Sequence, residues 1–302
     1  MKLNFGRLVR RNGLVRHAYN SAFNRDSSDI IILATIPRSG TTFLRYILTN
    51  YLRLLQSSDA QPVTYEDMHR TLFPNRKTYR PPVEYLPPSS VMDAVAYRDI
   101  YNTHKIHRCL AHSRARVIFL YRNPLDNLVS RYYYKYKYRP EQHDAARSID
   151  DIIAHELPQF ISDYRRIKYV CKRNGHARAV AYEKLTTDPF GTAHDLLTWL
   201  GIRVDPALLQ KAVDYSSFDQ VRKEEQRVGP IGAPKGFRGY FTRSGKIGQW
   251  KHHFDRDQIA HISRQLKKSG ISLDEFTLEA PADLAEDAQP QSGPRPRTSA
   301  KT

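Results

Sequence analysis

The sequence predicts an α/β protein in which helices flank a central parallel β-sheet. The runs 29–35 and 116–121 are almost continuously apolar, which is typical of parallel strands that helices cover on both faces. Shorter strand candidates occupy 100–105 and 177–182. Helical patterns separate these runs, and strands that alternate with helices favour a parallel sheet. A chain of 302 residues with 40% apolar residues is long enough for one such domain.

The charge of the chain indicates anionic partners. Lys and Arg number 48 against 31 Asp and Glu, which gives a formal net charge of +17. This surplus favours nucleotides, nucleic acid, sulfated or phosphorylated substrates, or membrane surfaces as partners. The apolar runs are too short to cross a bilayer, and two cysteines, Cys109 and Cys171, are too few for a disulfide framework. We therefore predict a reducing compartment and a cytoplasmic protein.

Composition divides the chain into three parts. Residues 1–28 form a basic N-terminal extension, since 1–25 hold six basic and no acidic residues. This segment is either a solvated extension or a helix that contacts a membrane surface or another anionic partner. Residues 29–279 form the single globular domain. Residues 280–302 are rich in proline and small polar residues, which predicts a disordered tail.

The first strand runs into a loop that suits an anion. Gly40 permits a backbone conformation that other residues avoid, and the amides of 39–43 would then open a helix. Backbone N–H groups and the helix dipole attract negative charge there. Arg38 adds a permanent charge, and the hydroxyl groups of Thr41 and Thr42 add donors. The alternative is that Ser39 or Thr41 only caps the helix.

This loop is not an ATP-type phosphate loop. That pattern needs glycine where Thr35 stands and lysine where Thr41 stands. In addition, the strand 116–121 runs into Arg122 and not into an acidic residue that would position magnesium. A kinase or nucleotidase that uses a metal-bound triphosphate is therefore disfavoured.

Further elements follow in order along the chain. We expect an irregular stretch at 57–92, a helix from 122–126 through about Tyr138, a helix over 150–171 interrupted early by Pro158, a helix over 195–200 ended by Gly201, and a loop over 226–248 rich in glycine and basic residues.

Three segments in this order resemble motifs of the sulfotransferases that use 3′-phosphoadenosine 5′-phosphosulfate (PAPS). Pro37–Arg45 resembles the loop for the 5′-phosphosulfate, Tyr121–Ser130 the motif for the 3′-phosphate, and Arg243–Lys251 the late R-x-G-x-x-G-x-W-K segment. The resemblance covers about 29–265. It implies a sulfotransferase fold related to P-loop nucleotide kinases, PAPS as the donor, and no metal.

The resemblance also implies the residues that bind the donor. The residues implied for the 5′-phosphosulfate are Arg38, Ser39, Gly40, Thr41 and Thr42. Those implied for the 3′-phosphate are Arg122, Ser130, Arg243, Ser244 and Gly245. Those implied for the adenine are Phe43, Tyr182 and Phe218. Taken alone, Arg122 would more simply form a surface ion pair with Asp126. Each aromatic residue alone would more simply belong to the core.

His104 resembles the catalytic base of the family, because it stands in Asn-Thr-His-Lys where the family has Lys-Thr-His. An imidazole suits proton abstraction from a hydroxyl. His107 and His69 are competitors, and a lone histidine is usually structural. Arg38 would stabilise charge on the leaving phosphate, where many soluble members carry lysine. Asn102 replaces a second lysine of those members.

The acceptor is open from the sequence alone. Residues 57–100 and 131–145 would line the side of the site where the acceptor binds. The segment Arg131–Arg139 holds five tyrosines and four basic residues, which either grip an anionic or sugar acceptor or form an ordinary amphipathic helix. Excess charge favours a saccharide, glycolipid or acidic peptide, and a small neutral alcohol or phenol is also open. Lys251 is not followed by the dimer segment of soluble members, so that dimer is not predicted.

Two other classes compete with a sulfotransferase. One is a nucleotide kinase-like enzyme, which magnesium-dependent ATP turnover would reveal. The other is a binder of polyanions or membrane surfaces that uses the net charge without catalysis. Nothing resembles a nucleic-acid module, so no nucleic-acid partner is expected. A catalytically inactive relative is disfavoured by the intact loop, histidine, arginine and serine.

Overall fold

A parallel sheet forms the centre of the molecule. The computed structural model describes residues 28, 30–71, 99–138, 148–229 and 237–276. Within them, four strands pair in the order β2-β1-β3-β4, and every pairing is parallel. The strands are β1 (Ile30–Thr35), β2 (Asp99–Thr103), β3 (Arg116–Tyr121) and β4 (Ala177–Ala181). The predicted α/β class and all four predicted strands are confirmed.

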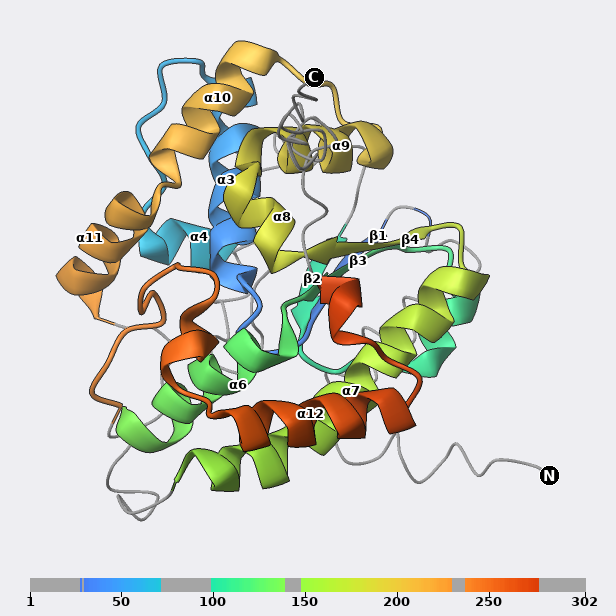
Figure 1. Ribbon diagram of the computed structural model, residues 1–302. Coiled ribbons are helices and arrows are strands. Elements are labelled where there is room, and N and C mark those ends of the chain that lie inside the picture. Colours follow the sequence, from blue (N-terminus) through green and yellow to red (C-terminus); the bar gives the residue numbers. More distant parts are fainter. Residues whose placement is uncertain (1–27, 29, 72–98, 139–147, 230–236, 277–302) are drawn as a thin grey trace, which may run out of the picture.

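Helices cover both faces of this sheet (Figure 1). On one face lie α6 (Pro124–Tyr132), α7 (Ile149–Arg173) and α12 (Arg256–Lys268). On the other face lie α3 (Thr41–Gln56), α8 (Tyr182–Thr187), α9 (Pro189–Leu200) and α10 (Pro206–Tyr215). The remaining described elements are α4 (Tyr65–Thr71), α11 (Phe218–Val228), the 3₁₀ turns at Arg108–His112, Gln249–His252 and Leu273–Phe276, and a π-helical turn, η3, at Tyr133–Lys137.

The alternation of side chains along the strands explains the two layers. Ile30 and Ile32 of β1 pack toward α6, α7 and α12, whereas Ile31 and Leu33 pack toward α3 and α9. Successive side chains of a strand point to opposite faces, so a run that is apolar throughout supplies both cores at once. All six residues of β1 are buried.

Three of the predicted elements differ in detail from the structure. Helix α7 is continuous through Pro158, which lies on the exposed side of the helix together with Ala154, the residue whose carbonyl group a proline at 158 cannot bond. The helix expected to reach Tyr138 ends as α6 at Tyr132 and widens into η3, where the Tyr138 amide donates to the Tyr133 carbonyl at 2.9 Å. Helix α11 extends to Val228 and so takes the first residues of the loop expected at 226–248.

Several predictions fall on parts of the chain outside the described residues. These are the basic extension up to 27, the tail from 280, and most of the irregular stretch at 57–92, of which residues up to 71 are described and contain α4. Among the described helices, none is both long and apolar enough to cross a bilayer.

The carboxyl ends of the four strands meet at one edge of the sheet, where the site is built. The loop with Arg38 follows β1, His104 follows β2, Arg122 follows β3, and Tyr182 follows β4. In an open parallel sheet this edge is where ligands bind.

We predict that replacing Phe119 in the centre of β3 by alanine lowers the free energy of unfolding by about 3–5 kcal/mol, because its fully buried ring would leave a cavity. Urea unfolding checks this. The control is Ile247→Ala, whose side chain is 39% exposed, and which we expect to cost less than about 1 kcal/mol. Equal losses in the two variants would contradict the assignment of Phe119 to the core.

Candidate active site

A cavity of about 590 Å³ opens at the carboxyl ends of the strands. Every residue that the sequence analysis assigned to the donor or to catalysis lines it, except Ser39. Ser39 is fully buried beneath the loop, where its hydroxyl group lies 3.4 Å from Nδ2 of Asn127. The parallel sheet therefore brings together residues that lie more than 200 positions apart in the sequence.

The loop after β1 has the backbone geometry that an anion site requires. Gly40 is the N-cap of α3 with φ of 87°, and Arg38 has φ of 71°, which is rare for a residue with a side chain. Within the described part of the chain no side chain caps the first turn of α3, so the alternative that Ser39 or Thr41 caps it is wrong. The hydroxyl of Thr41 instead donates to that of Thr35 at 3.0 Å. The amides at the start of α3 are left for a ligand.

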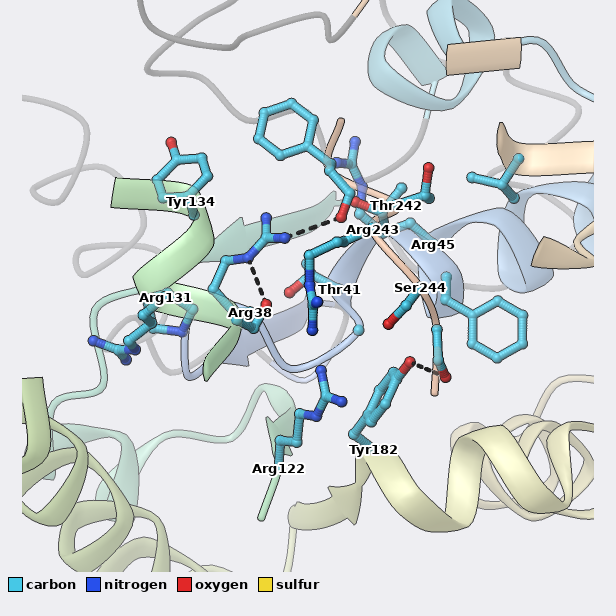
Figure 2. Close-up of a pocket in the computed structure, with 18 of the residues that line it drawn as sticks. Arg38, Thr41, Arg45, Arg122, Arg131, Tyr134, Tyr182, Thr242, Arg243 and Ser244 are labelled. Carbon is cyan, nitrogen blue, oxygen red and sulfur yellow. Dashed lines mark hydrogen bonds between the residues drawn. The ribbon is translucent and has the colours of Figure 1, made fainter. Parts of the chain in front are cut away.

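Gly40 is also required by its neighbour across the site. A Cβ atom at position 40 would lie 2.5 Å from Cδ2 of Tyr182. The Tyr182 ring therefore lies directly against the loop backbone, and its hydroxyl group donates to the carbonyl of Gly245 at 2.9 Å. Through these two contacts Tyr182 connects the first loop with the late one (Figure 2).

Arg38 lies in the middle of the pocket. Its Nε donates to the hydroxyl of Ser130 at 3.2 Å and its Nη2 to the carbonyl of Phe241 at 3.0 Å (Figure 2). The guanidinium lies 5.0 Å from the ring centroid of Tyr134. Burial lowers the pKa of Arg38 to about 10, and the charge of Arg122 acts in the same direction. Arg38 is thus a full cation at neutral pH whose charge the protein leaves only partly compensated.

Arg122 is buried and incompletely satisfied. Its Nη2 donates to the carbonyl of Lys246 at 2.9 Å, and its guanidinium lies 4.3 Å from the centroid of the Tyr182 ring. The expected contact with Asp126 exists at 3.8 Å, but both side chains are buried, so it is not a surface ion pair. The Nε of Arg122 is buried and bonds to no atom of the described chain. A buried donor of this kind requires a partner, which a bound anion would supply.

Arg243 enters the same space from the late loop. In Figure 2 its guanidinium and that of Arg122 point toward each other across the pocket. Arg243 donates to the Gln249 side chain and lies 4.3 Å from the Tyr133 ring. Burial lowers the pKa of Arg243, and the like charge of Arg122 lowers it further. The two guanidinium groups therefore repel each other unless an anion lies between them.

Two carboxylates that the sequence analysis did not assign to the site hold the late loop in place. Asp126 on α6 accepts from the amides of Gly248 at 2.7 Å and Trp250 at 3.1 Å. Glu225 on α11 is fully buried and accepts from the amide of Thr242 at 2.9 Å and from that of Phe241. Asp126 lies inside the motif Tyr121–Ser130, so the sequence could have indicated that it belongs to the site. No motif surrounds Glu225, so its role could not be predicted.

The aromatic residues predicted for adenine lie at one end of the pocket. Tyr182 is buried, Phe43 in the first turn of α3 packs against the core, and Phe218 is 39% exposed. Phe218 faces the late loop, since a Cβ at Gly245 would lie 2.8 Å from its Cδ2. Exposed aromatic surface beside buried guanidinium groups is suited to a base that carries phosphates.

His104 lies where β2 ends, with one side of its ring open to the pocket. Its Nδ1 is 2.8 Å from the hydroxyl of Thr35 and 3.2 Å from the carbonyl of the same residue. A carbonyl only accepts, so this second contact is made when Nδ1 carries the hydrogen, which leaves Nε2 as the basic nitrogen. Desolvation lowers the pKa of His104, and the charges of Arg131, Arg38 and Arg45 lower it further. His107 does not line the cavity.

The opposite end of the pocket carries aromatic and charged side chains. The rings of Tyr134 and Phe241 stack at 6.1 Å with an interplanar angle of 28°. Arg131, Lys135 and Glu156 line the same end. Within residues 131–138, the described part of the segment Arg131–Arg139, Lys137 covers the Tyr132 ring at 5.3 Å as in an amphipathic helix, while Tyr134 and Lys135 face the pocket.

Comparison with known proteins identifies the family. The sulfotransferase domain family matches residues 28–271. The chain belongs to the sulfotransferase family. It is 27% identical to sulfotransferase 2A6 of Rattus norvegicus over 74% of this chain and 78% of that protein. It is 26% identical to sulfotransferase 2B1 of Homo sapiens over 87% of this chain and 71% of that protein.

Solved structures agree with this sulfotransferase fold. Mouse sulfotransferase SULT7A1 complexed with PAP superposes with a TM-score of 0.59 at 18% sequence identity. The match covers 82% of this chain and 89% of the mouse chain. Retinol dehydratase in complex with androsterone and inactive cofactor PAP has a TM-score of 0.55 at 17% identity, covering 84% and 83%. The resemblance noted in the sequence, the sulfotransferase fold and an enzyme of the PAPS-dependent family are therefore confirmed.

Two glycines with positive φ separate backbone strain from the contact with Tyr182. Gly40→Ala and Gly201→Ala both place alanine in the left-handed region, at φ of 87° and 74°, but only position 40 has a neighbour in the way. We expect Gly201→Ala to lower the free energy of unfolding by about 1 kcal/mol and Gly40→Ala to lower it by at least about 2 kcal/mol. Urea unfolding measures both, and equal losses would show that Tyr182 does not constrain the loop.

Proposed function

We propose that this sulfotransferase moves the sulfuryl group of PAPS to an acceptor hydroxyl by in-line transfer, with His104 as the general base. The observation that carries the proposal is the placement of two separate cationic sites and one histidine around a single cavity. One cationic site consists of the α3 amides with Arg38, and the other consists of Arg122 with Arg243. A nucleotide with phosphates at both ends of its adenosine needs two such sites.

The residues present fit this donor. The buried Nε of Arg122 has no partner among the described residues, and a 3′-phosphate beside it would accept its hydrogen. Gly40 and the uncapped first turn of α3 form a backbone cradle for the 5′-phosphosulfate. Tyr182 and Phe218 offer ring surface at the adenine end. When bound, the donor supplies an activated sulfuryl group whose leaving group is a phosphate.

The chain's own residues then have distinct roles. Nε2 of His104 takes the proton from the acceptor hydroxyl as the new S–O bond forms. Arg38 stabilises the negative charge that develops on the departing phosphate, and it cannot act as an acid because it stays protonated. Thr35 holds Nδ1 of His104 and so keeps Nε2 available. The loop and the late segment hold donor and acceptor in line.

The structure gives less support to the competing functions. A kinase-like use of ATP would not need Arg122 and Arg243 on a second anion site. A surface binder would not need a histidine whose two ring nitrogens have different environments inside a cavity.

We predict that PAP (3′-phosphoadenosine 5′-phosphate) binds without magnesium and far more tightly than adenosine 5′-phosphate or ATP, because both anion sites are then used. Arg122→Ala should weaken PAP about 10- to 100-fold and reduce the discrimination against adenosine 5′-phosphate. Isothermal titration calorimetry measures both. Arg108→Ala is the control, since its guanidinium lies over the Tyr169 ring and does not line the cavity. No preference for PAP over adenosine 5′-phosphate would contradict the proposed donor.

The pKa of His104 should lie below its ordinary value of 6.5, because partial desolvation and the nearby cations disfavour the imidazolium. A base must be neutral to act, so turnover should fall as the pH drops through this lowered pKa and be flat above it.

We expect His104→Gln to reduce turnover about 10²- to 10⁴-fold with PAP affinity unchanged, and His107→Gln to leave turnover intact. PAP release with a panel of phenols, alcohols and sugars reports the rate, and NMR titration reports the imidazole pKa. A His104→Gln variant as active as the unaltered protein would rule out this base.

A further inference from the structure

The end of the pocket beside His104 carries a compact charged cluster that the transfer chemistry does not require. Arg131 on α6 and Lys135 on η3 both contact Glu156 on α7, one at each carboxylate oxygen. Nε of Arg131 donates to Oδ1 of Asn127 at 2.8 Å, and Asn127 donates in turn to the carbonyl of Pro37 at 2.8 Å. The cluster is thus fixed rigidly to the loop that is proposed to hold the donor.

Arg131 has one donor to spare. The residue is 5% exposed, and its Nη2 is buried with no hydrogen-bond partner in the described chain. In Figure 2 its guanidinium points away from Arg122 and Arg243 and lies on the Tyr134 side of the pocket. Among the charged groups, Arg131 contributes most to lowering the pKa of His104. An unused buried donor therefore lies on the Tyr134 side of the pocket, away from the proposed 3′-phosphate site.

The sum of charges gives an independent argument. Six cationic side chains line the pocket, namely Arg38, Arg45, Arg122, Arg131, Lys135 and Arg243, and Glu156 is the single acidic residue of the described chain that does so. The donor would bring about four negative charges. Of the six, Arg131 and Lys135 belong to neither proposed donor site, and together they outnumber the one carboxylate that they share, Glu156. Both oxygens of Glu156 are already used, so the cluster offers nothing to an amine.

We propose that the acceptor carries an anionic group, a carboxylate, sulfate or phosphate, near the hydroxyl that is sulfated, and that Arg131 and Lys135 bind this group. The inference rests on the proposed function and specifies its acceptor class. The π-helical turn is part of the arrangement, because it directs Lys135 to Glu156 while Lys137, two residues on, points to solvent.

The test compares hydroxyl compounds that differ in a single group. Purified full-length protein, with and without saturating PAP, is titrated by calorimetry with 4-hydroxyphenylacetate, its methyl ester and tyramine, and separately with glucuronate and glucose. We expect the acid to bind at least about tenfold more tightly than its neutral counterpart in one set or both, and tyramine to bind worst. No preference for the acid in either set would overturn the proposal.

A matched pair of variants separates recognition from folding. Lys135→Ala removes the pocket lysine and leaves Glu156 paired with Arg131, whereas Lys137→Ala removes the same charge from the same turn outside the pocket. Lys135→Ala should remove most of the preference for the acid, and Lys137→Ala should retain it. A Lys135→Ala variant that melts at a lower temperature but keeps the full preference would show a purely structural cluster and overturn the proposal.

The titrations distinguish the two hypotheses. Failure of PAP to bind would count against the proposed function, and the titrations without PAP would still report the acid preference. Normal PAP binding without an acid preference would overturn only the acceptor class.

Arg131→Lys keeps the charge but loses the planar donor, and we expect it to bind the acid about three- to tenfold more weakly than the unaltered protein. Unchanged binding of the acid by Arg131→Lys would remove Arg131 from the acceptor site.

Discussion

The arrangement of this site depends on holding several guanidinium groups together against their mutual repulsion. Arg38, Arg122 and Arg243 all reach one cavity, and each lowers the pKa of another or has its own lowered. Like charges in a partly desolvated cavity are unfavourable, so folding must supply the free energy that keeps them there. A multiply charged anion relieves this repulsion when it binds. The pocket is therefore less stable empty than loaded, which is typical of a preorganised binding site.

The fold supplies this free energy through the sheet and two buried carboxylates. The parallel strands fix the start of each loop, and their apolar faces form the two cores. Asp126 and Glu225 each accept from two backbone amides of the late segment and so hold it over the pocket. The rings of Tyr133, Tyr134 and Tyr182 face the three guanidinium groups and stabilise the cations without neutralising them.

Much of this arrangement could be predicted from the sequence because it follows from strand ends. The buried runs located the strands, and parallel strands end at one edge. His104, Arg122 and Tyr182 come directly after three of the described strands, and Arg38 lies in the loop after the fourth. The contacts that depend on distant segments could not be predicted. Glu156 and Glu225 meet the site only through tertiary packing, and the continuity of α7 through Pro158 depends on which side of the helix faces water. The π-helical turn after α6 likewise has no signal in the periodicity.

The central claim is that one cavity holds both phosphates of the donor, and a crystal structure with PAP tests it most directly. We expect the 3′-phosphate between Arg122 and Arg243, the 5′-phosphate on the amides at the start of α3 beside Arg38, and the adenine against Tyr182 or Phe218. Density for PAP in the reverse orientation, or bound outside this cavity, would contradict both the assigned roles and the mechanism built on them.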